Sequence, residues 1–403
     1  MMRFMMWVGV SLFAFDVLAA APLHKVPNAS PERYIVIMDD DKPAPEYADA
    51  LAREVRGRLV HVYSTVLNGF SIKANEQAAQ ALTRRPGVRA VWEVPTARIA
   101  DLQFGVPDGL DRIDQRETHL NDSYTYTMYT APVTIYVLDT GVDPRAEFGT
   151  RLTNINFTSD ANGHRDPNDY TDFGLPLNDV WHGTATAVVA AGAQNGVAKW
   201  AKIANVRVLR YDTGTYDDIV AGIQWVTQQR NLRPSEFHIA NASFGAMATG
   251  APYAPADTAY RASIAAGVAW VFAAGNDAGN ACNFYPANLS SLSGAISVGA
   301  MHANGNADVV TGYSNQGPCV DIYAPSEVEW GDPDTVAGGT SAAAPHVAGV
   351  FAIRWAASTT SSSGEIEGLV KGLATTGVLT NIWGTSNNLL LYSLRPKRRS
   401  VGS

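Results

Sequence analysis

The 403-residue chain has few charged side chains and carries an excess of acidic ones. Charged residues make up 17% of the sequence, and the net charge is −8. An acidic chain repels phosphate, which argues against a nucleic-acid-binding protein. There are no heptads, long repeats or phosphate-binding glycine loops, and 46% hydrophobic residues exclude a disordered or fibrous chain. The length is sufficient for one large core and a small accessory domain.

Long apolar runs are also lacking. The run at residues 4–15 is interrupted by Asp16, and it is shorter than the ~20 residues that a membrane-spanning helix needs. Arg3 precedes this run and small residues follow it, a pattern that predicts an export signal over residues 1–20, cleaved after Ala19 or Ala20. The alternative is an uncleaved anchor. We expect a secreted, extracellular protein that does not use a membrane as partner, with a vacuole or lysosome as the other destination.

One serine stands in a segment that we expect to begin a helix. Residues 339–341 read Gly-Thr-Ser and are followed by an alanine-rich run with Pro345. Helix N-termini present free N–H groups and the positive end of the dipole, which stabilise an anion formed there. We expect Pro345 to be tolerated because its missing N–H lies in the first turn. Taken alone, this segment is better explained as an ordinary helix cap.

An acidic residue and a histidine occupy comparable positions earlier in the chain. The apolar run 133–138 is typical of a buried parallel strand, and it ends at Asp139 in an Asp-Thr-Gly sequence. The carboxyl ends of such strands are where α/β sheets bind ligands, although Asp139 by itself could simply form a turn. His182 opens an alanine- and valine-rich segment that predicts a buried helix.

These three side chains suit nucleophilic catalysis. A serine hydroxyl must transfer its proton to a base that titrates near neutral pH, and an imidazole does so. The second imidazole nitrogen must be held by a carboxylate, which fixes the tautomer. We therefore predict Ser341 as nucleophile, His182 as base and Asp139 as its orienting acid.

The chain resembles the subtilisin-like serine peptidases, most closely the proteinase K and aqualysin branch. The resemblance rests on five motifs in the family's order: Asp-Thr-Gly at 139–141, His-Gly-Thr at 182–184, Asn-Ala-Ser-Phe-Gly at 241–245, Ala-Ala-Gly-Asn at 273–276 and Gly-Thr-Ser at 339–341. It implies that Asn276 is the side-chain donor to the oxyanion, a residue that would otherwise pass for an ordinary loop asparagine. It also implies that His346 has a packing role.

The implied peptidase domain covers residues 105–394. Apolar strands alternate with helical patterns there, which predicts an α/β fold with a parallel sheet covered by helices on both faces. We expect strands at 203–209, 238–242, 268–274 and 295–298, a helix at 216–229 and a final helix starting at Ser341. The basic segment 395–403 is predicted as a solvated tail.

A second small domain is predicted for residues 28–94. Strand patterns at 33–38, 67–72 and 86–93, with helices at 45–59 and 76–84, resemble the α+β propeptide inhibitor of subtilases. The resemblance implies that this propeptide inhibits its own peptidase domain and that the precursor cuts itself. Residues 95–104 show no regular pattern and form the predicted linker, with Ala100-Asp101 as the expected scissile bond.

The family resemblance also predicts how a protein or peptide substrate binds. A substrate would add as a strand along the wall formed by Ser243, Phe244 and Gly245, and Ala273, Ala274 and Gly275 would line the pocket for the residue before the cut. Small residues leave that pocket open and apolar. We expect a monomeric endopeptidase of broad specificity that prefers apolar or aromatic residues at this position.

Cysteines are scarce, and the two present suggest one disulfide in an exported chain. Their surroundings resemble the paired cysteines of the aqualysin branch, which implies a bond between Cys282 and Cys319, although two free buried thiols are the alternative. Related enzymes bind calcium for stability, and Asp321 stands where one ligand is expected. No cofactor is expected for catalysis.

The chain departs from the family at the histidine helix. The segment after His182 reads Gly-Thr-Ala-Thr-Ala-Val, where the family usually has Gly-Thr-His-Val-Ala-Gly, and Trp181 replaces the usual glycine. The interval from Asp139 to His182 is also longer than usual. A second hypothesis is therefore a weakly active or inactive binding protein with the subtilase fold.

Overall fold

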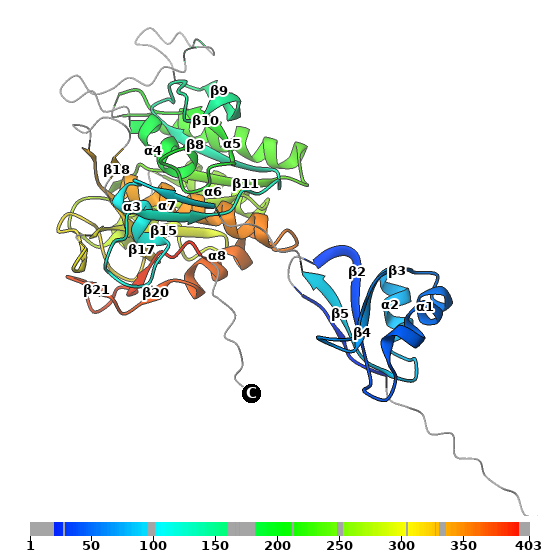
Figure 1. The fold of residues 1–403 in the computed structure, drawn as a ribbon. Coiled ribbons are helices and arrows are strands. Elements are labelled where there is room, and N and C mark those ends of the chain that lie inside the picture. The colour runs from blue at the N-terminus through cyan, green and yellow to red at the C-terminus, as the bar shows by residue number, and fades with distance from the viewer. Residues whose placement is uncertain are drawn as a thin grey trace, which may run out of the picture. The chain divides into compact units, whose positions relative to one another are not determined.

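The computed structural model describes residues 20–26, 29–95, 101–158, 166, 169, 182–211, 213–247, 253–303, 305–326, 328–329 and 336–394. The chain forms two compact units, Met1–Arg98 and Ile99–Ser403 (Figure 1). The division between the units falls inside the segment 95–104 that the sequence predicts as a linker. The predicted signal peptide and the basic tail lie outside the described residues, apart from Ala20.

The first unit is a five-stranded sheet with two helices. Its elements are β1 (Leu23–His24), β2 (Ala29–Met38), α1 (Ala44–Glu54), β3 (Arg58–Tyr63), β4 (Gly69–Lys73), α2 (Glu76–Leu82) and β5 (Val88–Pro95). The strand order is β1-β5-β2-β4-β3. Ala44, Ala48 and Ala52 recur every fourth residue of α1, so one face of this helix packs into the core of the sheet.

Two predictions for this unit are wrong. The helix expected at 45–59 ends at Glu54, and β3 follows it where no strand was expected. Arg56 has a positive φ of 55°, which breaks the helix. A side chain at Gly57 would meet the Ile72 side chain at 2.4 Å, so the turn packs directly on β4. This close packing is a tertiary contact that the local pattern does not contain.

The second unit is built on a large sheet. Its elements are β6 (Asp101–Phe104), α3 (Asp108–Ile113), β7 (Ser123–Tyr126), β8 (Val133–Asp139), η1 (Gly149–Arg151), β9 (Leu152–Asn156), α4 (His182–Ala191), β10 (Lys202–Arg207), α5 (Tyr216–Leu232), β11 (Phe237–Ala242), β12 (Ala246–Met247), α6 (Ala254–Ala265), β13 (Ala269–Ala273), η2 (Ala281–Asn283), β14 (Phe284–Tyr285), η3 (Ala287–Leu289), β15 (Ala295–Ala303), β16 (Asp308–Val310), β17 (Ile322–Pro325), β18 (Val328–Glu329), β19 (Val336–Ala337), α7 (Thr340–Ala357), α8 (Ser363–Gly372), β20 (Thr375–Thr376), β21 (Leu379–Thr380) and β22 (Leu389–Leu390).

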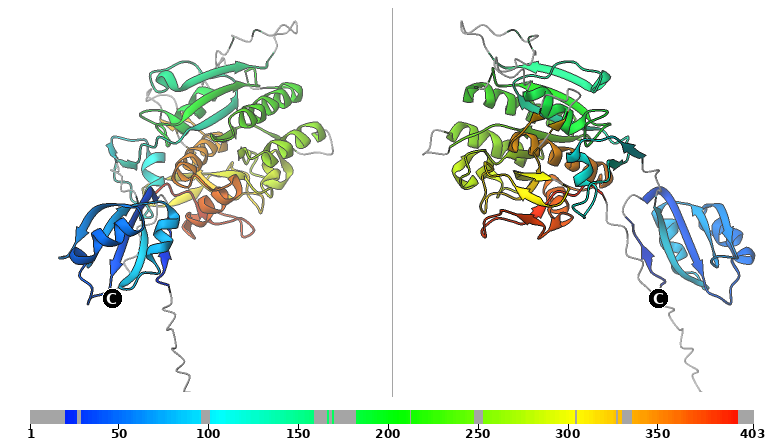
Figure 2. Two further views of the ribbon diagram at one scale, coloured as in Figure 1. Left: turned by 90° about the vertical axis from the view of Figure 1, so that its right-hand side faces the viewer. Right: turned by 60° about the vertical axis from the view of Figure 1, so that its left-hand side comes forward.

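Helices cover both faces of this sheet (Figure 2). Its main path is β20-β22-β17-β15-β13-β11-β8-β10-β9, and every neighbouring pair from β17 to β9 is parallel. Alternate residues of the fully buried β8 enter different cores. Ile135 and Val137 join the core of α4 and α7, whereas Tyr136 and Leu138 join the core of α5 and α6. The predicted α/β fold with helices on both faces is confirmed.

Several elements differ from the sequence prediction. The segment at 101–104, expected to be irregular, forms β6 and pairs antiparallel with β7. The helices α3 and α6 were not expected, and α7 is not the final helix because α8 follows it. A local signal for α8 exists: Ser362 and Glu365 form a reciprocal capping box, the Ser-x-x-Glu pattern that starts helices.

The expectation for Pro345 is also wrong. It lies inside α7 rather than in the first turn, so the N–H it lacks would have bonded the carbonyl of Ser341 four residues earlier. That carbonyl instead accepts a hydrogen bond of 2.8 Å from the hydroxyl of Ser243. Because Pro345 has no N–H, the carbonyl of Ser341 is free to accept this bond from Ser243, which directly follows β11. The bond ties the start of α7 to the sheet.

His346 packs within the core and makes stability depend on pH. Burial lowers the pKa of His346 from 6.5 to about 4. A hydrogen bond of 2.9 Å between its Nδ1 and the carbonyl of Ala342 opposes this shift, because it favours the protonated ring. Between these two pH values the histidine is protonated in the unfolded chain but neutral in the folded chain. The contribution of His346 to stability therefore falls as the pH drops from about 6.5 to about 4, by up to about 3 kcal/mol.

Urea unfolding at pH 7 and pH 4.5 measures this effect as a difference between two proteins, and we expect acidification to be less favourable to the stability of wild type than to that of His346→Gln. Burial raises the pKa of Asp114 and Asp321 to about 6, and these carboxyls oppose the loss equally in both proteins. His238, whose pKa is also lowered by burial, contributes to the remaining slope in both proteins. An equal change in wild type and His346→Gln would contradict the prediction.

Candidate active site

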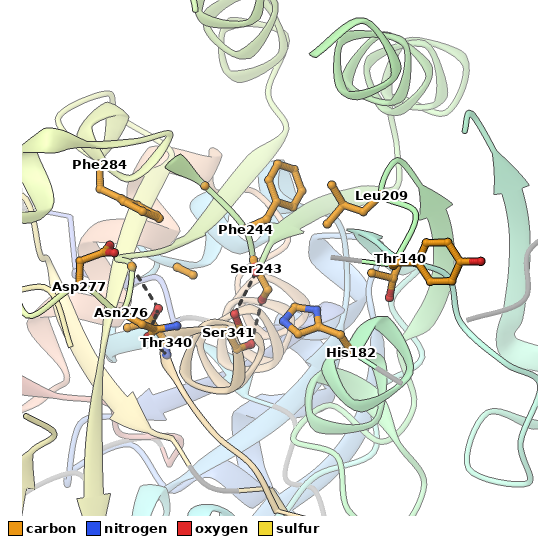
Figure 3. A pocket seen from close by; sticks show the side chains of 14 residues that line it. Thr140, His182, Leu209, Ser243, Phe244, Asn276, Asp277, Phe284, Thr340 and Ser341 are labelled. Atoms are coloured by element: carbon orange, nitrogen blue, oxygen red, sulfur yellow. Dashed lines mark hydrogen bonds between the residues drawn. The ribbon is translucent and has the colours of Figure 1, made fainter. Parts of the chain in front are cut away.

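A cavity of about 400 Å³ opens where the parallel strands end. Its walls come from the segments that follow β8, β10, β11 and β13 and from the first residues of α4 and α7 (Figure 3). The lining residues are Thr140, His182, Leu209, Tyr211, Ser243, Phe244, Gly245, Ala273, Gly275, Asn276, Asp277, Phe284, Thr340 and Ser341. This is the position in which open α/β sheets bind ligands.

Asp139 holds His182 from beneath this cavity. The last residue of β8 is fully buried, and its Oδ1 accepts a hydrogen bond of 2.7 Å from Nδ1 of His182. The same oxygen accepts the N–H of Thr140 at 2.7 Å. Because Nδ1 carries the donated proton, the other ring nitrogen of a neutral His182 is a proton acceptor.

The start of α4 is fixed against the turn that follows β8. The N–H of Gly183 donates to Oγ1 of Thr140 at 3.0 Å. A side chain at Gly183 would come within 2.1 Å of the carbonyl oxygen of Gly141 and 3.0 Å of Cβ of Asp139, so glycine is required there. These contacts bring His182 to Asp139 although 43 positions separate them in the chain. Ala185 and Thr186, which depart from the family pattern beside it, lie within regular helix, whereas Trp181 lies outside the described residues.

Ser341 lies in the first turn of α7 and lines the same cavity as His182 (Figure 3). Its hydroxyl donates to the carbonyl of Ser243 at 2.9 Å, while the hydroxyl of Ser243 donates to the carbonyl of Ser341. The serine side chain has one rotatable bond to its oxygen, so a change of rotamer reorients the hydroxyl within the cavity.

The amide of Asn276 is oriented by Thr340. Its Oδ1 accepts the N–H of Thr340 at 2.9 Å and the Thr340 hydroxyl at 3.0 Å, and that hydroxyl accepts the N–H of Gly275 at 3.1 Å (Figure 3). With its oxygen engaged, the Nδ2 group is the end available for donation. Within the described part of the chain, neither Nδ2 of Asn276 nor the N–H of Ser341 has a hydrogen-bond partner.

The predicted wall residues reach the cavity with one exception. Ser243, Phe244, Gly245, Ala273 and Gly275 line it, as does Asn276. Ala274 does not. It is fully buried in a separate core with Met301 and Tyr323, because alternate residues at the end of β13 face opposite sides.

Further lining residues were missed by the sequence reasoning. They are Thr140, Leu209, Tyr211, Asp277, Phe284 and Thr340. A signal existed for Leu209 and Tyr211, since Leu209 ends a predicted parallel strand and Tyr211 comes shortly after it, as Asp139 comes after another. Asp277 directly follows Asn276. Phe284 had no signal, because its place depends on how the segment after η2 folds back on the cavity.

A disulfide supports that segment. Cys282 and Cys319 are joined, with a Cα–Cα distance of 5.1 Å and a sequence separation of 37. The predicted pairing is present. Under the chain-entropy account, a loop of this length stabilises the folded state by ~3–4 kcal/mol. Cys282 lies two residues before Phe284, so the disulfide restrains the part of the cavity wall that Phe284 forms.

The surroundings of Asp321 do not fit calcium. Its Oδ2 accepts the N–H of Ser297 at 2.9 Å, and its Oδ1 lies 3.4 Å from Nζ of Lys371, which also contacts Glu367. Burial raises the pKa of Asp321 to about 6, which weakens it as an anionic ligand. Calcium requires six to eight oxygens, whereas here an ammonium group occupies the cation position. The described residues contain no group of three or more metal-ligating side chains.

Comparison with known families identifies both units. Residues 131–386 match the Subtilase family, and residues 33–96 match Peptidase inhibitor I9. These matches define a serine-type endopeptidase, a hydrolase that carries a peptidase-inhibitor domain. The chain belongs to the subtilase family, which confirms the class predicted from the sequence.

Individual relatives agree with this identification. The extracellular serine proteinase of Thermus sp. (strain Rt41A) is 32% identical over 397 residues, 92% of this chain and 91% of that protein. Alkaline serine exoprotease A of Vibrio alginolyticus is 35% identical over 294 residues, 71% of this chain and 50% of that protein. The crystal structure of a cold adapted subtilisin-like serine proteinase aligns with a TM-score of 0.61 and 33% identity, covering 72% of this chain and 99% of that one.

Among the described residues, no helix is both long and apolar enough to cross a bilayer.

Proposed function

We propose that this serine endopeptidase works through Ser341, His182 and Asp139 and an acyl-enzyme intermediate. His182 accepts the proton of Ser341 as its oxygen attacks the peptide carbonyl, and then delivers that proton to the leaving amine. Asp139 holds the imidazole and stabilises its protonated form. Water, activated by the same imidazole, hydrolyses the ester and regenerates the serine.

The tetrahedral intermediate carries a negative oxygen, for which we propose two donors. Nδ2 of Asn276 is free to donate because Thr340 engages the amide oxygen. The N–H of Ser341 lies at the start of α7, where the helix dipole favours negative charge. Donors that are fixed before the reaction stabilise the transition state without a cost of reorganisation.

The observation that carries this proposal is the 2.7 Å bond between the buried Asp139 and Nδ1 of His182, in a cavity that Ser341 also lines. A buried carboxylate directed at a histidine ring supports a base with a defined tautomer. A fluorophosphonate probe, which reacts with activated serines, tests it. Labelling of wild type but not of Ser341→Ala supports the triad.

No labelling of a properly processed wild-type protein would favour the alternative, a weakly active or inactive binding protein. The altered residues after His182 motivate this alternative. They are accommodated in the regular helix α4, and the contacts that hold His182 come instead from Asp139 and from the bond between Gly183 and Thr140.

We further propose that the protein is exported and made as a zymogen. The export signal at 1–20, the inhibitor domain at 28–94, the linker at 95–104, the peptidase domain at 105–394 and the tail at 395–403 would be its parts. The extracellular relative and the inhibitor match support this organisation. The inhibitor unit would act as an intramolecular partner until the enzyme cuts near Ala100-Asp101. N-terminal sequencing of the secreted protein tests both cleavages.

Substrate would pair as an extended strand along residues 243–245, and the apolar lining supports broad specificity for protein substrates. Phe284 adds an aromatic surface to the small residues predicted from the sequence. We expect peptides with apolar or aromatic residues before the cut to be hydrolysed well, which a peptide panel measures. Cleavage restricted to arginine and lysine would contradict the apolar preference.

Replacing Asn276 by alanine removes the proposed side-chain donor to the oxyanion. We expect kcat to fall by ~10²–10³ with little change in KM, a magnitude that comes from the equivalent change in subtilisin, a member of the same family. Steady-state kinetics on a peptide substrate measure it. Asn283→Ala, an asparagine in η2 that does not line the cavity, is the control. A fall confined to KM would contradict the oxyanion role.

A further inference from the structure

The loop at residues 274–279 follows β13 and carries Asn276. The side chain of Asn276 reaches the cavity, where Thr340 bonds its amide oxygen (Figure 3). A donor stabilises an oxyanion best when it is fixed before the reaction, and this requires a fixed backbone as well as a fixed side chain. Thr340 fixes the side chain of Asn276, whereas a residue from another part of the chain fixes the backbone around it.

That residue is Asn315, which lies between β16 and β17. The N–H of Asn315 donates to the carbonyl of Gly275 at 2.9 Å, and its side-chain Oδ1 accepts the N–H of Asp277 at 3.1 Å. Gly275 and Asp277 are the chain neighbours of Asn276 on either side. One residue therefore bonds both neighbours of the proposed donor.

The side-chain amide of Asn315 extends these contacts along the loop. Its Nδ2 donates to the carbonyl of Ala274 at 2.9 Å, and its Oδ1 also accepts the N–H of Gly279 at 2.8 Å. The residue is only 1% exposed, and a side chain at Gly275 would collide with its Nδ2. An amide has a donor and an acceptor, whereas a carboxylate lacks the donor and an apolar side chain lacks both. Asparagine suits this position because the loop offers it both N–H groups and a carbonyl.

Asn315 is itself anchored to the large sheet. Its carbonyl accepts a hydrogen bond of 3.0 Å from the hydroxyl of Ser314, and that hydroxyl accepts the N–H of Ala300 at 3.0 Å. Ala300 lies in β15, the parallel neighbour of the strand from which the loop emerges. The backbone around Asn276 is therefore connected through Asn315 to a buried strand.

We propose that Asn315 is a positioning residue for the reaction, which holds Asn276 where its Nδ2 meets the oxyanion. This inference rests on the proposed function. Asn315 does not line the cavity, so it acts on the reaction through Asn276 rather than on the substrate. Without its side chain, the N–H groups of Asp277 and Gly279 lose their acceptor and the loop can shift. A small displacement of a catalytic group is enough to lower the rate.

A double-mutant cycle tests this role, with Asn315→Ala made in wild type and in Asn276→Ala. In wild type we expect kcat to fall by about tenfold with KM changed by less than about twofold, since a displaced donor loses only part of its effect. In Asn276→Ala the same substitution should lower kcat by less than about twofold, because the donor that it positions is already absent.

A peptide aldehyde gives a second measurement, because it forms a hemiacetal with the serine and resembles the tetrahedral intermediate. Its inhibition constant should rise by about tenfold in Asn315→Ala. Titration with the fluorophosphonate probe counts the active molecules, so that kcat refers only to folded enzyme. If Asn315→Ala yields no folded enzyme, Asn315→Ser, which keeps a hydroxyl at this position, is carried through the same cycle.

Asn388→Ala is the matched control. Asn388 also uses both ends of its amide, which bond the N–H and the carbonyl of Leu379, and it does not line the cavity. Its kcat should lie within about twofold of wild type.

A fall in kcat of equal size in both backgrounds, or no fall in wild type, would overturn the inference and leave the endopeptidase assignment intact. Should Asn276→Ala itself retain the wild-type kcat, the proposed oxyanion donor would be wrong, and this inference with it.

Discussion

Replacement of Ser341 by alanine is expected to lower kcat by about 10⁶-fold, the magnitude known for the nucleophile of subtilisin, a member of the same family. Alanine cannot form the acyl-enzyme, so only binding and the oxyanion donors would accelerate the reaction. The same variant should accumulate as an uncut precursor, because the inhibitor unit would no longer be cleaved from the peptidase unit. Casein digestion and the mass of the expressed chain measure the two effects.

The matched control for this experiment is Ser291→Ala, which removes a serine hydroxyl from an exposed position outside the cavity. It should be processed and active. Adding a trace of wild-type enzyme to the Ser341→Ala precursor should release a mature chain, which shows that the precursor is folded and cleavable. Digestion by that mature variant at more than about one per cent of the wild-type rate would exclude Ser341 as the nucleophile.

The second large effect is expected for Asp139→Asn, with a loss of about 10⁴-fold in kcat. An asparagine keeps the size of the side chain but can present an N–H to the imidazole and favour the wrong tautomer. The base would then direct a proton, rather than a lone pair, toward Ser341. The buried position of Asp139 prevents water from compensating for the change.

Steady-state kinetics on one peptide substrate measure this loss, with circular dichroism to show that the sheet is retained. Asp257→Asn is the control, since this carboxylate pairs with Arg261 in α6 away from the cavity. We expect its kcat to lie within about twofold of wild type. If Asp139→Asn kept more than about a tenth of the activity, the orienting role of Asp139 would be rejected.

Much of the second unit could be predicted from local patterns. Runs of mainly apolar residues predict β8 and β13, and both strands are buried along their whole length. Buried parallel strands have continuous apolar sequences, so their pattern survives without knowledge of their neighbours. The short strand β6 lacks such a run, and it exists through its pairing with β7.

Candidate site residues were predictable for the same reason. Asp139 ends a strand that the sequence predicts, Ser243 and Asn276 follow two others, and His182 and Ser341 stand at the start of apolar helices. Parallel strands bring their carboxyl ends to one edge, so these residues meet in one region. The directions in which their side chains point could not be predicted, because a shift of one position along a strand turns a side chain to the other face of the sheet.

The sequence by itself determined the class of fold, the family and the candidate residues Asp139, His182 and Ser341, because these depend on local apolar patterns and short motifs. Tertiary structure alone decided that Ala274 faces a separate core, that Phe284 lines the cavity, and that the hydroxyl of Ser243 bonds the carbonyl of Ser341 that Pro345 leaves free. These features arise from contacts between segments far apart in the chain. Such contacts leave no periodic signal in either segment, since each depends on the packing of the other.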